Sequence, residues 1–139
     1  MGNNTDWRVE LNQAGASLQE LLSEGMPAED LGRWVQRLEE RLGQLSRALT
    51  GFSSDCDGGL YDDCVELAPR LVPRVNKIRS EQVQLQASVD QQIQRLQTDE
   101  PDSSLHRSMA DIIHKVGRLN HHAVDLVYSA YDTDLGGPG

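Results

Sequence analysis

Apolar residues recur at intervals of three and four positions along most of the chain. This spacing places apolar side chains on one face of an α-helix and leaves polar residues on the other faces. No stretch alternates between apolar and polar residues over a useful length, so β-strands are not expected. The pattern predicts an all-α protein with four helices, over residues 5–24, 28–66, 70–97 and 104–131.

The first predicted helix carries an apolar stripe that consists of Trp7, Leu11, Ala14, Leu18 and Leu21. Thr5 is of a type that caps helix N-termini, and Gly25 is of a type that ends helices. Pro27 fits the first turn of the second helix, where Glu29 and Asp30 would suit the helix dipole.

The second predicted helix has the longest apolar stripe, which continues through the segment DCDGGLYDDC at 55–64. The stripe consists of Leu31, Val35, Leu38, Leu42, Leu45, Leu49, Phe52, Cys56, Leu60 and Cys64. Gly51, Gly58 and Gly59 each weaken a helix by about 1 kcal/mol relative to alanine. We therefore expect a weak point at 51–59, with both cysteines buried as free thiols.

The last two predicted helices repeat the same spacing. Their stripes are Leu71, Val75, Ile78, Gln82, Leu85, Val89, Ile93 and Leu96, and then Leu105, Met109, Ile112, Val116, Leu119, Ala123, Leu126 and Ala130. Pro69 or Pro73 fits the start of the third helix, and Ser103 or Ser104 fits the N-cap of the fourth. Short connections between four amphipathic helices predict one domain over 1–139, an antiparallel bundle with up-down-up-down topology.

Charge and composition indicate which classes of partner are disfavoured and in which cellular compartment the protein is expected. The 139 residues carry a formal net charge of -9, which disfavours binding to nucleic acid and to anionic membrane surfaces. No apolar run approaches the roughly 20 residues that span a bilayer, and the start MGNNTDW shows no signal peptide. Two cysteines do not make a disulfide framework, so a reduced, cytoplasmic location is expected.

All four histidines lie in the last third of the chain, and His114 and His121 share a helix face with Arg118 and Asp125. At roughly 100° per residue, this face points away from the apolar stripe that contains Val116. A metal site in a helical bundle projects inward, so we interpret the four residues as a solvated face and not as ligands. The same face is a candidate contact patch for a partner.

The dense aspartates of DCDGGLYDDC raise a calcium loop as an alternative. Asp55 and Asp57 stand at the first and third positions of a loop of the required length that ends at Glu66. Gly59, at the fifth position, offers no side-chain oxygen to the ion. We expect the aspartates to cap and solvate a helix junction instead.

Two segments resemble the bacterial hemerythrin-like (HHE cation-binding) family. They read GFSSDCDGGLYDDCVELAPRLVPRVNKIRSEQVQL at 51–85 and DLVYSAYDTDLGG at 125–137. Members of that family often carry a Gly-Gly pair and an aromatic residue on the second helix, followed by Ala-Pro-x-Leu, and an Ala-Tyr pair on the last helix. The resemblance covers about residues 28–137 and implies a hemerythrin-type four-helix bundle.

The iron ligands of that family are missing here. Aligned to the family frame, the ligand positions of the second, third and fourth helices are occupied by Gly51, Asp55, Gln82, Leu119 and Ala123. The resemblance places these five positions inward, where one aspartate and one glutamine cannot replace the imidazoles and carboxylates of a di-iron centre. Leucine and alanine would let such a vestigial site close by packing.

Two residues carry separate expectations about the core. Gln82 is the one polar residue of its stripe and needs a buried partner or a water, and Ser53, Ser54 or Asn12 could supply such a partner. Trp34 is a second candidate contact surface, with a place at the flank of the core as the simpler interpretation.

These observations predict a non-enzymatic bundle that has lost its di-iron site, uses no cofactor and serves as a structural or protein-interaction module. The expected partner is another protein or a second copy of the chain. The competing hypothesis is a metal-binding oxygen or redox sensor with a non-standard site that uses Asp55, the cysteines or the histidines. A third is a small-ligand cavity in the vacated site, near Gln82 and Gly51.

Overall fold

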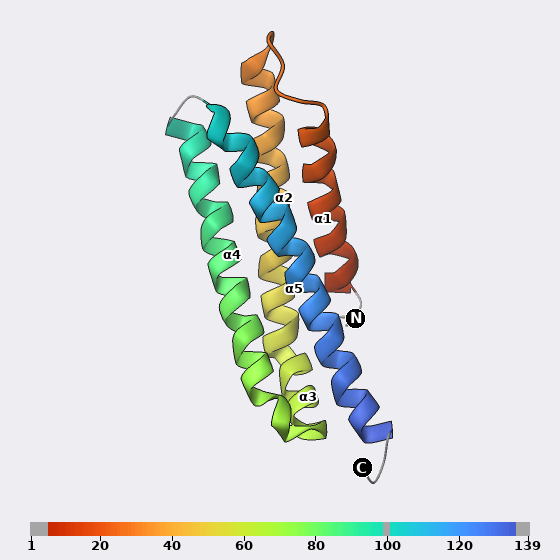
Figure 1. The fold of residues 1–139 in the computed structure, drawn as a ribbon. Helices are drawn as coiled ribbons and strands as arrows, with labels where there is room; N and C mark the ends of the chain where they lie inside the picture. Colours follow the sequence, from red (N-terminus) through yellow and green to blue (C-terminus); the bar gives the residue numbers. More distant parts are fainter. Residues whose placement is uncertain (1–5, 99–100, 136–139) are drawn as a thin grey trace.

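The computed structural model of the protein describes residues 6–98 and 101–135, and all regular structure in these ranges is helical. The four long helices, which lie side by side in Figure 1, are α1 (Asp6–Ser23), α2 (Leu31–Asp55), α4 (Val72–Thr98) and α5 (Ser103–Leu135). The elements that join α2 to α4 are the π-helical turn η1 (Cys56–Leu60), the short helix α3 (Tyr61–Leu67) and the 3-10 turn η2 (Pro69–Leu71). The prediction of an all-α four-helix bundle is confirmed.

Each long helix packs against two others, so the four helices enclose one core. Helix α1 contacts α2 and α5, and α4 contacts the same two helices. Between α1 and α2, Arg41 donates to the carbonyl oxygen of Ser17 at 2.6 Å, and Arg37 lies 3.2 Å from Glu24. These two contacts join the second half of α1 and the residue after it to the first half of α2.

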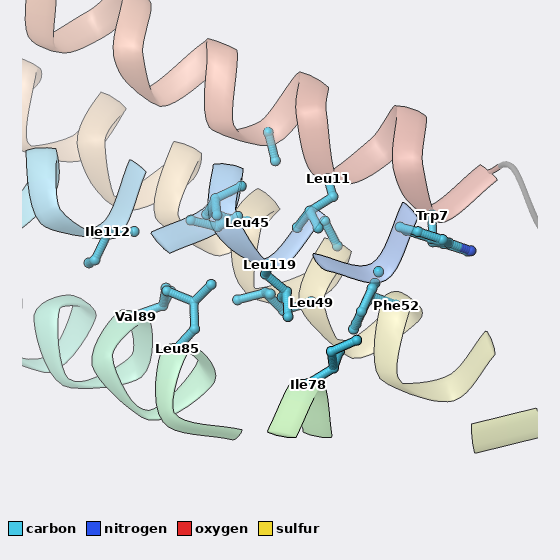
Figure 2. Packing of buried hydrophobic residues seen from close by; sticks show 14 of the residues in the cluster. Trp7, Leu11, Leu45, Leu49, Phe52, Ile78, Leu85, Val89, Ile112 and Leu119 are labelled. Atoms are coloured by element: carbon cyan, nitrogen blue, oxygen red, sulfur yellow. The ribbon is translucent and has the colours of Figure 1, made fainter. Parts of the chain in front are cut away.

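The apolar stripes meet in the middle of the bundle. Figure 2 shows Leu11 of α1, Leu49 and Phe52 of α2 and Leu119 of α5 between the helices, and each is at most 1% exposed. The ring of Trp7 meets Phe52 edge to face, with 5.1 Å between the ring centroids and 83° between their planes. Since buried apolar area contributes roughly 25 cal/mol per Å², this aliphatic interior is the main stabilising feature of the fold.

The segment DCDGGLYDDC forms the joint at which α2 gives way to α3. Its buried side chains follow one another at steps of four, in the order Phe52, Cys56, Leu60 and Cys64. In an α-helix each step of four overshoots the preceding side chain by about 40°. The wider turn of η1 takes up this overshoot, and Gly59 within it has non-helical angles of φ 166° and ψ -36°. A weak point was predicted at 51–59. The departure from α-helical geometry lies at 56–60, because α2 continues to Asp55.

The connection between α1 and α2 is longer than predicted. Gly25 has φ 81°, which fits its expected role at the end of α1. Helix α2 begins at Leu31, and Asp30 before it has a left-handed backbone with φ 55°. The prediction that Pro27 opens this helix, with Glu29 and Asp30 in its first turn, is therefore wrong.

The N-cap of α5 is Asp102, and not Ser103 or Ser104 as predicted. The Asp102 carboxylate accepts hydrogen bonds from the hydroxyl of Ser104 at 2.5 Å and from its backbone N–H at 2.9 Å. These bonds hold the pKa of Asp102 below its usual value. Thr5, the predicted cap of α1, lies outside the described residues.

In α2 and α4, one position of the predicted apolar stripe is replaced in the core by the residue before it. Trp34 is 5% exposed and belongs to the core, whereas Leu31 and Val35 are half-buried. Likewise, Gln92 is 8% exposed and Ile93 is half-buried. A straight helix drifts by about 20° per heptad relative to a strict seven-residue repeat, so the predicted face slips away from the core toward the helix ends. Trp34 is consequently not an exposed contact surface.

The Phe52 ring tests how tightly the core is packed. We expect Phe52→Ala to lower the free energy of unfolding by about 3–5 kcal/mol, because it removes a fully buried ring and leaves a cavity. Urea denaturation measures the loss. The control is Val83→Ala at a position that is 63% exposed, with an expected change within about 0.5 kcal/mol. Equal effects of the two substitutions would contradict this packing.

Candidate functional site

The five positions that the resemblance assigns to former iron ligands do not all face the core. Gln82, Leu119 and Ala123 are buried, with exposed fractions of 7%, 1% and 0%. Gly51 is half-buried and Asp55 is exposed. The expectation of an inward-facing Asp55 is therefore wrong, because this residue lies one position, or roughly 100° of helical turn, from its buried neighbour in the stripe.

Gln82 has a polar partner, although not one of the expected residues. Its Nε2 donates to the backbone carbonyl oxygen of Leu49 at 3.4 Å. No hydrogen bond joins Gln82 to Ser53, Ser54 or Asn12, all of which are described residues. The amide is thus accommodated by a main-chain oxygen of the neighbouring helix, which needs no polar side chain in the core.

A small-ligand cavity was expected near Gln82 and Gly51, and buried side chains lie at the level of Gln82. A Cβ at Gly51 would lie 3.7 Å from Oε2 of Glu10, which is ordinary van der Waals contact. Leu49 and Leu119 belong to the buried cluster at this level and lie close to the bundle axis (Figure 2). The small-ligand cavity in the vacated site stays a prediction.

The donor set at this level does not fit a di-iron centre. Iron of that type needs imidazole and carboxylate groups that converge from several helices. The inward positions offer one amide, at Gln82, together with the aliphatic side chains of Leu119 and Ala123. Within residues 6–98 and 101–135, no group of three or more His, Cys, Asp or Glu side chains could hold a metal ion.

A polar pair at the edge of the core was not predicted from the sequence. Nδ1 of His122 on α5 lies 2.9 Å and 3.1 Å from the two carboxylate oxygens of Glu81 on α4. Both side chains are partly buried. They immediately neighbour the inward residues Gln82 and Ala123, so pairing the third and fourth predicted helices by register could have found them.

The predicted surface patch is exposed, and one member is engaged within the chain. His114, Arg118, His121 and Asp125 all have exposed side chains. Asp125 accepts a hydrogen bond from Arg74 of α4 at 2.7 Å. Because Asp125 is already paired, the rest of the patch, which consists of His114, Arg118 and His121, contains no acidic side chain.

A pocket of about 210 Å³ opens between α4 and α5 beside this patch. Its lining residues, which define the α4–α5 pocket, are Lys77, Glu81, Gln84, Leu85, Lys115 and Arg118. Lys115 pairs with Asp111 at 3.0 Å on the same helix. In the part of the chain that the structure describes, Lys77 and Arg118 form no ion pair.

Both cysteines are free and fully buried, as predicted. Burial raises the pKa of the Cys56 thiol to about 12, against a lowering contribution from its hydrogen bond with Tyr61. Burial also raises the pKa of Cys64. Eight residues of helix separate Cys56 and Cys64 by roughly 12 Å along the axis, beyond the roughly 7 Å that a disulfide can bridge. The thiols therefore behave as apolar core groups.

One aspartate of the joint, Asp57, contacts side chains of α2 and α4. Asp57 accepts a hydrogen bond from Nε of Arg79 at 3.1 Å. The Arg79 guanidinium also lies 4.8 Å from the centroid of the Tyr61 ring, at a distance typical of a cation–π contact. Arg79 thus ties α4 to η1 and α3, and this joint is organised by an ion pair and an aromatic ring.

No family model, curated protein or solved structure matches this chain. The resemblance to hemerythrin-like proteins stays a prediction drawn from 51–85 and 125–137. Among the described helices, none combines the length and the apolar character that crossing a bilayer requires.

The raised pKa of Cys56 predicts how stability depends on pH. In the unfolded chain the thiol ionises near its ordinary value of 9.0, whereas in the folded protein it stays protonated up to about 12. Above about pH 9 the unfolded state therefore binds fewer protons, and the free energy of unfolding falls as pH rises toward 12. Urea denaturation over a pH series measures this slope.

Cys56→Ala should reduce the slope of stability against pH, because it removes one of the titrating thiols. Leu60→Ala removes buried apolar atoms from the same turn without removing a titratable group, so it should keep the wild-type slope. If Cys56→Ala also kept that slope, ionisation of this thiol would not be coupled to folding.

Proposed function

We propose that the protein is a cytoplasmic, non-enzymatic bundle of hemerythrin type that holds no metal and binds an acidic segment of another protein. The contact surface is the α4–α5 pocket together with the exposed residues His114 and His121 beside it. The observation that carries this proposal is the composition of the pocket. Three of its six lining residues are cationic, on a chain whose net charge is -9.

An antiparallel up-down-up-down topology is part of this proposal, and contacts between neighbouring helices support it. Arg79 of α4 pairs with Asp57 at the joint after α2, whereas Gln86 of α4 bonds to Ser46 of α2. In these pairs residue numbers rise on one helix as they fall on the other, as they also do in the contacts Ser17–Arg41 and Glu24–Arg37. The pairs Glu81–His122 and Arg74–Asp125 follow the same rule between α4 and α5.

The closed interior favours a surface function. Leu119 and Ala123 occupy ligand positions of the family frame with side chains that cannot coordinate iron, and Gln82 is held by a backbone carbonyl. Reversible oxygen binding, iron storage and oxidase activity each require a metal centre there, so we do not assign them. Binding through the outer faces of α4 and α5 needs no interior chemistry.

Charge complementarity selects the class of partner. Glu81 is the one acidic residue that lines the pocket, and its carboxylate is engaged by His122 at 2.9 Å. Lys77 and Arg118 therefore face an incoming ligand without a competing acid in the pocket lining. A polyanion as large as DNA would also meet the negative remainder of the surface, whereas a short acidic peptide segment would meet the pocket alone.

Iron reconstitution separates this proposal from the metalloprotein alternative. Protein purified without a His-tag, incubated anaerobically with ferrous iron and desalted, should retain no bound iron by elemental analysis. It should also lack an oxo-bridged absorption band, because the buried positions of the family frame, Gln82, Leu119 and Ala123, offer one amide and no imidazole or carboxylate. Retention of about two irons per chain would contradict the proposal and favour a sensor.

Charge reversal in the pocket tests the binding surface. We expect hexaglutamate, titrated at low ionic strength into ¹⁵N-labelled protein, to shift the backbone amide resonances around Lys77, Lys115 and Arg118. The double variant Lys77→Glu/Arg118→Glu should weaken this binding on the order of tenfold, since each reversal replaces an attraction with a repulsion. Added salt should weaken the wild-type interaction as well.

The matched control is Arg33→Glu/Arg47→Glu, which changes the net charge equally at two exposed positions of α2. This variant should bind hexaglutamate almost as the wild type does. An equal loss of binding in both double variants would indicate a response to net charge alone, and the pocket would then not be the contact surface.

A further inference from the structure

A second pocket, of about 260 Å³, lies where α1 begins and is lined by residues of α1, η1 and α5. Its apolar wall comes from Leu60 of η1 and from Val124 and Val127 of α5. It shares no lining residue with the α4–α5 pocket. The site is therefore a separate concave surface at another place in the bundle.

A buried donor without an acceptor lines this pocket. Trp7 is 2% exposed, and its indole Nε1 is buried and has no hydrogen-bond partner among the described residues. The ring is held in place by its edge-to-face contact with Phe52. Figure 2 shows the indole nitrogen at the end of the ring that lies away from Leu11 and the interior. A ligand oxygen at this place would satisfy an N–H group that is otherwise unpaired at a cost to the fold.

A cation lies next to this donor in the sequence and in the same pocket wall. Arg8 is half-buried and lines the pocket together with Trp7. Over the described ranges, Arg8 takes part in no ion pair. One carboxylate has two oxygens, so it could accept from the indole N–H and pair with the guanidinium at the same time.

The remaining wall of the pocket is aromatic. Tyr128 and Tyr131 are 71% and 48% exposed, and both line the pocket on the same stretch of α5. Tyrosine rings so exposed are poorly placed for core packing and well placed to cover a ligand ring. A cavity of about 150 Å³ holds benzene, so about 260 Å³ is enough for one aromatic ring with a short chain.

We propose that this pocket binds a small aromatic carboxylate, with the carboxylate on Trp7 Nε1 and Arg8 and the ring against Tyr128, Tyr131 and the apolar wall. The proposal goes beyond the binding of an acidic protein segment, because it concerns a different pocket and a different class of ligand. The test uses 3-phenylpropionate as the probe.

The indole N–H resonances report binding directly. In ¹⁵N-labelled protein, the Nε1–H resonance of Trp7 should move downfield and saturate as 3-phenylpropionate is added. Trp34 provides an internal control, because its indole Nε1 is also buried without a partner but lines another part of the molecule. Its resonance should stay in place. A Trp7 resonance that fails to move at millimolar probe would overturn the proposal.

The contributions of charge and ring are separated with analogues. The neutral 3-phenylpropanamide should bind about tenfold more weakly than 3-phenylpropionate, because it cannot pair with the guanidinium. Propionate, which lacks the ring, should give no saturating shift. Equal binding of all three compounds would show that the pocket does not recognise an aromatic acid.

Variants at exposed or half-exposed positions complete the test without disturbing the core. Arg8→Gln should weaken 3-phenylpropionate about tenfold and leave 3-phenylpropanamide unchanged, whereas Arg33→Gln on α2 should change neither. Tyr128→Ala should weaken both aromatic compounds. Unchanged affinity in both Arg8→Gln and Tyr128→Ala would overturn the proposal, and hexaglutamate binding should be the same in all three variants.

Discussion

Burial of four apolar helix faces against one another is the interaction on which every other feature of this protein depends. Most helical stability in proteins comes from tertiary packing of an apolar face, and α1, α2, α4 and α5 each cover the stripe of two neighbours. Leu11, Leu49 and Phe52 are completely removed from solvent as a result. Aliphatic and aromatic groups fill the axis of the bundle, and the described acidic, basic and histidine side chains are left at its rim and on its outer faces.

Because of this division, polar groups that could contact a ligand lie mainly at the edge of the core and on the outer faces of the helices. Under the proposed kinship with hemerythrin-like proteins, Leu119 and Ala123 stand where donors would have to be, and the helices close over them by packing. His122 and Glu81 meet at the edge of that level, where they join α4 to α5 without entering the core. Among the described residues, an unpaired donor lies near the start of α1, at Trp7, and cations without an ion pair line the α4–α5 pocket.

The sequence was sufficient for features that depend on local periodicity and insufficient for those that depend on how helices are rotated and paired. The buried state of both cysteines, Gln82 and Leu119 followed from steps of three and four. Trp34 and Asp55 were misplaced because a rotation of one residue changes which side of a helix is covered, and only the neighbouring helices determine that rotation. The Glu81–His122 pair and the pocket beside Trp7 depend on the register between helices, which no single stripe encodes.

The π-helical turn has a consequence for how the chain can vary in length. It contains one residue more than an α-helical turn over the same rotation, and the buried positions on either side stay on one face because the wider turn absorbs that extra residue. Removing a residue between Cys56 and Leu60 would turn a run of fours into the ordinary alternation of four and three, with Cys64 still inward. A Cβ at Gly58 or Gly59 would meet no heavy atom within 4 Å, so no packing ties either glycine to its place. The joint is thus a point at which relatives of different length could share the same core.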